Sequence, residues 1–226
     1  MDEKKYVFHL TLLDIYELIK PLCHNVYYMP LCISDKWKMN EIPEKYPIIV
    51  QLGRNNHILH KYALKFVQEY PEYEYIYADY DETTKQLTYF STQEGQINTL
   101  KSRNDYMKML NRAAVCILSS PGIDKSRKIA DGIDYPTPRF YETAINYCHM
   151  IARYGTDHEE FQIQGISNIC DSISEFSDFK NKLLSMLSGI SVDKNKYDIF
   201  INMHLTSTWF KDFKQILNEY DTKFKA

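Results

Sequence analysis

Short, continuous apolar runs alternate with longer stretches of helical spacing along most of the chain. The apolar runs are typical of strands buried on both faces, and they cover residues 47–53, 73–79, 114–120 and 149–154. A fifth candidate strand covers 167–173. Helical spacing recurs after the runs, over residues 60–70, 104–113, 140–148 and 175–187. This alternation predicts βαβ units around a doubly wound parallel sheet.

The first part of the chain is less regular. It begins with an apolar run at 6–10 and a helical stretch that stops at Pro21. An extended segment over 25–33 follows, and the polar, proline-marked residues 34–47 predict a linker.

Three further expectations concern the middle and the end of the chain. The polar residues 81–101 predict a hairpin or an irregular excursion. Asn104 is placed to cap the helix that follows. The last 30 residues predict one more helical stretch, with Trp209 and Phe213 on its apolar stripe.

Composition narrows the class of protein. A length of 226 residues fits one large domain or one domain with extensions, and the net charge of −3 argues against broad nucleic-acid binding. No run approaches the roughly 20 apolar residues of a membrane span, and the N-terminus does not resemble a signal peptide. We expect a cytoplasmic protein, either free or peripheral at the inner face of the membrane. The 5 cysteines are widely spaced, and we expect buried, reduced thiols.

Three segments follow predicted strands, where ligands bind in an open parallel sheet. They are Gly53-Arg54, residues 119–122 with Pro121 and Gly122, and the loop that begins at Asp134. A glycine after a buried strand lets a backbone approach a ligand closely, and an arginine beside it can bind a phosphate through two N–H groups. The alternative for Arg54 is an ordinary surface charge.

The segment from Asp134 to Glu142, DYPTPRFYE, carries the most specific pattern. Thr137 can cap the following helix, and Pro138 suits the first helical position. Open N–H groups at a helix start attract a diphosphate, and Arg139 would add positive charge there. Glu142, one turn further, can accept two hydrogen bonds from a ribose diol. The alternative is that Glu142 only favours the helix start electrostatically and that Arg139 is solvated.

Other charged residues give weaker signals. Lys61 lies in the first turn after Gly53-Arg54, where it would either reach a phosphate or face solvent. Asp79, Asp81 and Glu82 form an acidic patch without the ligand spacing of a metal site. We therefore expect neither a bound metal nor a cofactor.

The order of these segments resembles the C-terminal donor-binding domain of GT-B glycosyltransferases, of the groups called family 1 and family 4. In that family a glycine and an arginine, often followed by a lysine, hold the donor diphosphate, and an E-x7-E motif spans the loop and first helix turn. Arg54 matches the arginine, and Glu142 matches the second glutamate, which binds the ribose. Asp134 stands in the first position as a shorter acid. Leu59 occupies the usual lysine spacing, two residues before Lys61.

The resemblance covers about residues 46–187 and implies a Rossmann-like fold. It also implies a retaining, metal-independent transfer of a sugar from a nucleoside diphosphate sugar to a glycan or lipid-linked acceptor, as in polysaccharide biosynthesis. The catalytic residues would be Asp134, Glu142 and Arg54. The donor-binding residues would be Gly53, Arg54, Lys61, Pro121, Gly122, Thr137, Pro138, Arg139 and Glu142.

The resemblance further divides the chain into three parts. Residues 1–45 would be the last strand and helix of an acceptor domain plus a linker, 46–190 the donor-binding domain, and 191–226 a helix that crosses back. A separate acceptor-domain chain is then a candidate partner, besides the nucleotide sugar and the acceptor. Two alternatives stay open: a non-catalytic α/β module that binds nucleotide or docks a partner, and another doubly wound enzyme for a phosphorylated metabolite.

Overall fold

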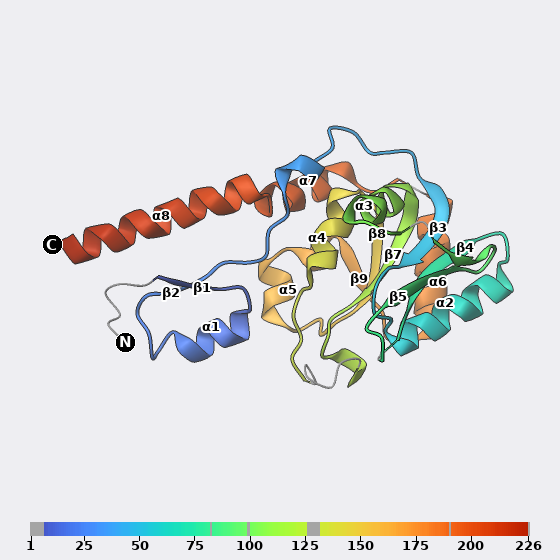
Figure 1. The fold of residues 1–226 in the computed structure, drawn as a ribbon, viewed down its shortest axis with the longest axis horizontal. Coiled ribbons are helices and arrows are strands. Elements are labelled where there is room, and N and C mark those ends of the chain that lie inside the picture. Colours follow the sequence, from blue (N-terminus) through green and yellow to red (C-terminus); the bar gives the residue numbers. More distant parts are fainter. Residues whose placement is uncertain (1–6, 82, 99, 126–131, 190, 226) are drawn as a thin grey trace.

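Within the described residues, seven strands form one sheet in the larger, right-hand part of the molecule in Figure 1, with helices on both of its faces. The computed structural model describes residues 7–81, 83–98, 100–125, 132–189 and 191–225. From edge to edge the strands are β6 (Gly95–Ile97), β5 (Leu87–Ser91), β4 (Glu74–Tyr80), β3 (Tyr46–Gln51), β7 (Ala113–Ser119), β8 (His149–Arg153) and β9 (Cys170–Ser172). This α/β, Rossmann-like architecture confirms the predicted fold class.

The order of the strands places a ligand-binding position at the centre of the sheet. β3, β4, β7, β8 and β9 are parallel, with β4 on one side of β3 and the later strands on the other. The chain thus winds in opposite directions from β3, and ligands bind beyond the carboxyl ends of the strands at such a switch point. Here that position lies between the ends of β3 and β7. The predicted excursion over 81–101 is an antiparallel hairpin, β5–β6, that extends the sheet beyond β4.

Alternating side chains of the strands build two apolar cores. In β3, Ile48 and Val50 belong to one core and Ile49 to the other. The core around Ile49 is covered by α2 (His57–Glu69) and α6 (Phe176–Ser188). The opposite core is covered by α3 (Arg103–Arg112), α4 (Pro138–Ile145), α5 (Glu159–Ile163) and α7 (Lys194–Met203).

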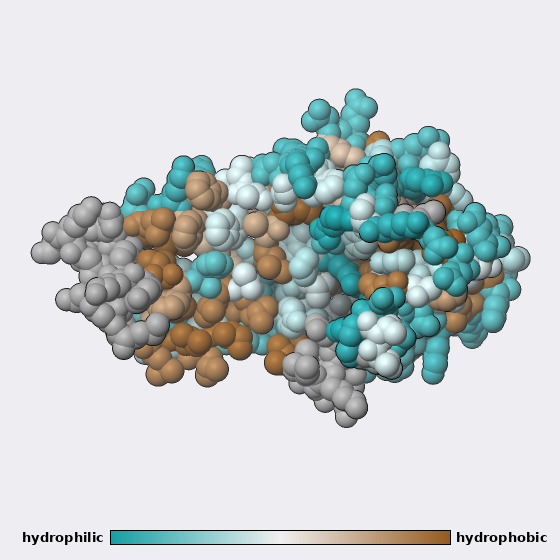
Figure 2. Space-filling model, in the orientation of Figure 1, coloured by the Kyte–Doolittle hydropathy of each residue, from teal (hydrophilic) through white to brown (hydrophobic). Residues whose placement is uncertain are grey.

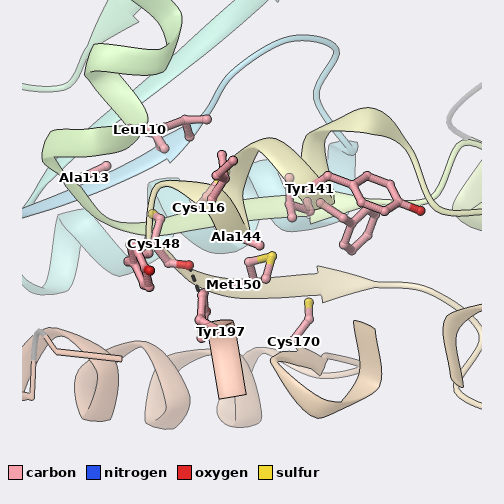
Figure 3. Packing of buried hydrophobic residues seen from close by; sticks show 14 of the residues in the cluster. Leu110, Ala113, Cys116, Tyr141, Ala144, Cys148, Met150, Cys170 and Tyr197 are labelled. Atoms are coloured by element: carbon pink, nitrogen blue, oxygen red, sulfur yellow. Dashed lines mark hydrogen bonds between the residues drawn. The ribbon is translucent and has the colours of Figure 1, made fainter. Parts of the chain in front are cut away.

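Three of the cysteines lie in the second of these cores. Figure 3 shows Cys116, Cys148 and Cys170 among apolar side chains, with Tyr197 of α7 donating a hydrogen bond to the Cys148 carbonyl at 2.9 Å. Burial raises the pKa of the Cys148 thiol to about 11. All five cysteines are free thiols, but Cys32 is exposed and Cys23 half-buried. The prediction of burial is therefore confirmed for these three and wrong for Cys32.

A small unit at the N-terminus lies beside the sheet domain. It consists of two parallel strands, β1 (Phe8–Leu10) and β2 (Val26–Tyr28), joined by α1 (Leu13–Ile19). The long helix α8 (Thr206–Lys225) packs along it, with the His9 ring against the rings of Trp209 and Phe213 (Figure 1). Apolar side chains gather on the surface of this unit in Figure 2. Leu18, in α1, and Leu22, which follows it, are among the exposed large apolar residues.

The prediction of one helical stretch over the last 30 residues is wrong, because α7 and α8 are separate helices. Ile33, the last residue before the linker, pairs with the backbone between them. Its N–H donates to the His204 carbonyl at 2.8 Å, and its carbonyl accepts from the Thr206 N–H at 2.9 Å. These bonds satisfy the backbone at the break and tie the linker to the C-terminal part of the chain. Over the described ranges no helix is long and apolar enough to cross a membrane.

Two local predictions also need correction. Ser102, rather than Asn104, caps α3: its hydroxyl accepts from the Asp105 N–H, and the Asp105 carboxylate accepts from the Ser102 N–H. The fifth strand is shorter than predicted, because Gly165 has a φ of 73° and leads into a 3-10 turn at Ile166–Asn168. The linker also contains a 3-10 turn, Asp35–Trp37. Tyr6 and Glu82, which belong to predicted features, lie outside the described residues.

Candidate functional site

A cavity of about 620 Å³ opens at the carboxyl edge of the sheet, where the strand order reverses. Its walls come from the ends of β3, β4 and β7, the β5 strand, α3, and the start of α4. The lining residues are Gln51, Gly53, Arg54, Asn55, Tyr80, Leu87, Tyr89, Arg103, Tyr106, Ile117, Leu118, Ser119, Pro121, Tyr135, Thr137, Pro138, Arg139 and Glu142. Seven of the ten residues predicted from the sequence are among them; Asp134, Lys61 and Gly122 are not.

Gly53 makes room for the side chain of Arg139. Gly53 has a φ of 110°, a conformation that side chains disfavour, and the Arg139 guanidinium occupies the space that a Cβ at this position would need. The close approach expected for the backbone of Gly53 is therefore made by an arginine of the protein. This contact places the Arg139 guanidinium beside the end of β3.

Arg54 lies next to this contact. Its guanidinium stacks on the ring of Tyr80 at 4.3 Å from the ring centroid, while the residue stays exposed. Within the described residues, neither Arg54 nor Arg139 forms an ion pair with a carboxylate. The two guanidinium groups are thus available to an anionic ligand.

The two helix starts at this edge of the sheet differ. At α2, the Asn56 side chain accepts hydrogen bonds from the N–H groups of Ile58 and Leu59, both at 3.0 Å, so the start is capped. At α4, Pro138 occupies the first helical position as predicted, but Thr137 makes no capping bond with its side chain. The expected Thr137 cap is therefore not formed. Pro138 has no N–H, and the Phe140 N–H donates to the Thr137 carbonyl at 3.1 Å, so the start of α4 offers the cavity the Arg139 N–H and the positive end of the helix dipole.

Glu142 is the buried carboxylate of the site. The residue is only 5% exposed, and its Oε1 accepts a hydrogen bond from Arg103 Nη2 at 2.5 Å. The Arg103 side chain is 54% exposed and lies over the ring of Tyr106, at 5.4 Å from the ring centroid. Arg103 was not predicted, because an arginine at a helix start resembles an ordinary solvated charge in the sequence. Only the packing of α3 against α4 brings it to Glu142.

Tyr106 adds a buried hydroxyl beside this pair. Its Oη has no hydrogen-bond partner among the described residues and is shielded from solvent. Burial, with a smaller contribution from the neighbouring Glu142 carboxylate, raises the pKa of Tyr106 well above its usual range. The hydroxyl is therefore a neutral donor or acceptor at the wall of the cavity.

Asp134 and Lys61 lie outside the cavity for identifiable reasons. The Asp134 carboxylate accepts a hydrogen bond from the Gly155 N–H, which ties the loop before α4 to the end of β8. On α2, Leu59 is fully buried against the sheet, and Lys61, two residues later, points to the exposed side. The sugar contact expected for Asp134 and the phosphate contact expected for Lys61 thus have no support in this arrangement.

A network not predicted from the sequence holds the loop after β7. Asp124, with a φ of 55°, binds the Arg153 guanidinium with both carboxylate oxygens and accepts from Asn56 Nδ2 at 2.9 Å. Arg153 ends β8, and Asn56 caps α2. The network therefore fixes three segments of the carboxyl edge relative to each other, next to the cavity.

No protein-family description matches this chain, and no curated protein matches its sequence. In the part of the chain that the structure describes, no group of three or more His, Cys, Asp or Glu side chains is placed to hold a metal ion. What can be inferred about function therefore rests on the chemistry of the cavity.

Proposed function

We propose that this chain is the donor-binding half of a GT-B-type glycosyltransferase and that it binds a nucleoside diphosphate sugar between β3 and β7. The observation that carries this proposal is the composition of one cavity. Among the described residues, three arginines and the open start of α4 face it, together with one buried carboxylate. The chain as a whole has a net charge of −3, so positive charge is concentrated here. Such a concentration favours an anionic ligand.

The arrangement along α4 suits a nucleoside diphosphate. Arg139 lies in the first turn, next to Arg54, and together with the helix start they would bind the diphosphate. Glu142 lies three residues further, a rise of about 4.5 Å along the helix. A carboxylate at that distance from the phosphates is suited to accept hydrogen bonds from the ribose hydroxyls. Tyr89 and Tyr135 supply aromatic walls for the rest of the ligand.

The proposed reaction breaks the bond between the anomeric carbon and the diphosphate oxygen, and the electron pair leaves with the diphosphate. An oxygen of the glycan or lipid-linked acceptor forms the new bond to the anomeric carbon, and its proton passes to the departing diphosphate oxygen. Arg54, Arg139 and the positive end of the α4 dipole would stabilise the negative charge that grows on the leaving group. We assign no step to Asp134, because its carboxylate binds the Gly155 N–H.

Isothermal titration of the purified chain with UDP, GDP and ADP sugars tests the donor site. At least one of them should bind, and Arg139→Gln and Glu142→Ala should each weaken its binding at least about tenfold, or about 1.4 kcal/mol. Lys108→Gln is the matched control, since it removes one positive charge from an exposed position of α3 that does not line the cavity. Failure of every nucleotide to bind, or unchanged affinity in Glu142→Ala, would contradict the proposal.

A second candidate is a non-catalytic module that binds the nucleotide sugar without transferring it. The position of Asp134 outside the cavity favours this candidate, because the resemblance assigned the donor-sugar contact to that residue. The two functions differ in the release of nucleoside diphosphate from a bound donor in the presence of acceptor glycans or lipids. Binding without any release would favour the module, and release that depends on Arg54 would favour the transferase.

A further inference from the structure

The ion pair between Arg103 and Glu142 uses only part of the hydrogen-bonding capacity of both residues. One guanidinium nitrogen, Arg103 Nη2, contacts one carboxylate oxygen, Glu142 Oε1. Among the described residues, no hydrogen bond of good geometry reaches Glu142 Oε2, although the Tyr106 hydroxyl lies close to this carboxylate, and Arg103 has no second acceptor. A carboxylate can accept several hydrogen bonds and a guanidinium can donate five. The pair therefore presents an acceptor and several donors side by side.

The surroundings of the pair favour a polar, uncharged group of the ligand. Both residues line the cavity, and the unpartnered Tyr106 hydroxyl lies beside them. The pair as a unit is formally neutral, in contrast to Arg54 and Arg139, which have no carboxylate partner among the described residues. An adjacent donor and acceptor match two neighbouring hydroxyl groups, each of which can both donate and accept.

We propose that Arg103 is a specificity-determining residue of this site, which positions Glu142 and shares with it the recognition of a cis-diol. Glu142 Oε2 accepts from one ribose hydroxyl, and an Arg103 N–H donates to the oxygen of the other. This inference rests on the proposed function, because the diol is taken to be that of a ribonucleoside diphosphate. The site would accordingly select ribonucleotides over 2′-deoxyribonucleotides.

The geometry of Arg103 also separates its role from that of a phosphate ligand. Arg103 contacts the residue that lies one helical turn inside α4, whereas Arg139 lies at the helix start, where the dipole attracts phosphate. An arginine that bound phosphate would contribute equally to ribonucleotides and deoxyribonucleotides. An arginine that recognises the diol would contribute only to ribonucleotides.

The test is calorimetric titration of UDP, ADP and GDP, each beside its 2′-deoxy form, into the wild type, Arg103→Gln and the double variant Arg103→Gln/Glu142→Gln. The double variant guards against a folding defect, because it leaves no unpaired buried carboxylate. The wild type should prefer the ribonucleotide at least about tenfold, since a lost hydroxyl leaves buried polar groups without partners. In Arg103→Gln the preference should fall at least about threefold, although Glu142 Oε2 can still accept from one hydroxyl, and in the double variant the two forms should bind within about twofold of each other. Lys108→Gln, on the exposed side of α3, should keep the preference of the wild type.

Each outcome bears on a different proposal. If nucleotides bind but the wild type does not distinguish ribose from deoxyribose, the role of Arg103 is overturned and the donor site stands. If Arg103→Gln weakens both forms equally and keeps the preference, Arg103 is a phosphate ligand and the inference is wrong. If none of the nucleotides binds the wild type, the donor site and the inference both fail.

Discussion

The backbone of Gly53 and the guanidinium of Arg139 lie against each other at the end of β3. This position requires a glycine for two reasons: its φ is 110°, and the guanidinium occupies the space that a Cβ would need. The sequence indicated only that another group approaches the backbone of Gly53 closely, and we expected this group to be a ligand. The structure shows that the approaching group belongs to α4. The role of this glycine is therefore to position an arginine of the cavity.

Gly53→Ala should destabilise the fold and weaken nucleotide binding, because its Cβ would displace the Arg139 guanidinium. Gly95→Ala is the control: it has a φ of 76°, but a Cβ there meets nothing within 4 Å. The control should cost about 1–2 kcal/mol for the left-handed backbone and leave nucleotide binding unchanged. Gly53→Ala should cost a similar amount in stability but weaken nucleotide binding, because the flexible end of Arg139 can move aside only by leaving its place in the cavity. Denaturant unfolding and calorimetric titration measure the two effects, and unchanged binding in Gly53→Ala would contradict the steric argument.

At the scale of elements, α3 and α4 supply the buried carboxylate and two of the three arginines that line the cavity. α4 begins at Pro138 with an open start, and α3 begins at Arg103 directly after its cap, Ser102. Because Arg103 is the first residue of α3, the cap of this helix determines where its guanidinium lies relative to Glu142. The sequence prediction placed the cap at Asn104, whereas the residue at the third helical position, Asp105, forms the capping box with Ser102.

Ser102→Ala should lower the free energy of unfolding by about 1 kcal/mol, the usual effect of losing a helix cap. Asn104→Ala should change it by less than about 0.5 kcal/mol, because Asn104 is exposed and lies within the first turn. Chemical denaturation of the two variants distinguishes them. A larger loss in Asn104→Ala than in Ser102→Ala would mean that the cap lies where the sequence alone placed it.

At the scale of the whole molecule, a buried polar network joins the N-terminal unit to the sheet domain. Glu160 of α5, 1% exposed, accepts from the Tyr28 hydroxyl of β2 at 3.2 Å and from Gln164 Nε2 at 2.9 Å. Gln164 also accepts from the hydroxyl of Tyr141, which precedes Glu142 in α4. The N-terminal unit is thus linked through α5 to the helix that carries the cavity residues.

Burial raises the pKa of Glu160 above its usual range, so the folded state favours the protonated carboxyl. The contribution of Glu160 to the free energy of unfolding is therefore complete below the pKa that its carboxyl has in the unfolded chain, about 4.3. This contribution is lost as the pH rises through the higher pKa of the same carboxyl in the folded state. Glu160→Gln should remove this loss, so the stability of the variant relative to the wild type should increase as the pH rises above about 4.3. Thermal unfolding at a series of pH values from about 4 upward measures the difference. The exposed neighbour variant Glu159→Gln should follow the wild type, and a Glu160→Gln profile parallel to the wild type would refute the argument.

The local pattern of apolar residues was sufficient to predict the α/β class, the parallel core strands and most helices, because burial alternates with the period of each element. It also identified Gly53, Arg54, Pro138, Arg139 and Glu142 as residues near one edge of the sheet. Their common location followed from the rule that parallel strands end at the same edge. This much depends on local periodicity and chain direction, and both are visible in the sequence.

Only the tertiary structure decided which side chains meet. Arg103 reaches Glu142 because two helices distant in sequence pack side by side, and Asp134 leaves the cavity because the Gly155 N–H at the end of β8 binds its carboxylate. The break between α7 and α8 likewise depends on Ile33, far away in the chain. Such contacts depend on the order of strands and the course of loops. The sequence determined the elements and their shared edge, whereas long-range packing determined the partners of each charge, since a carboxylate or guanidinium binds whichever group the fold brings within hydrogen-bonding distance.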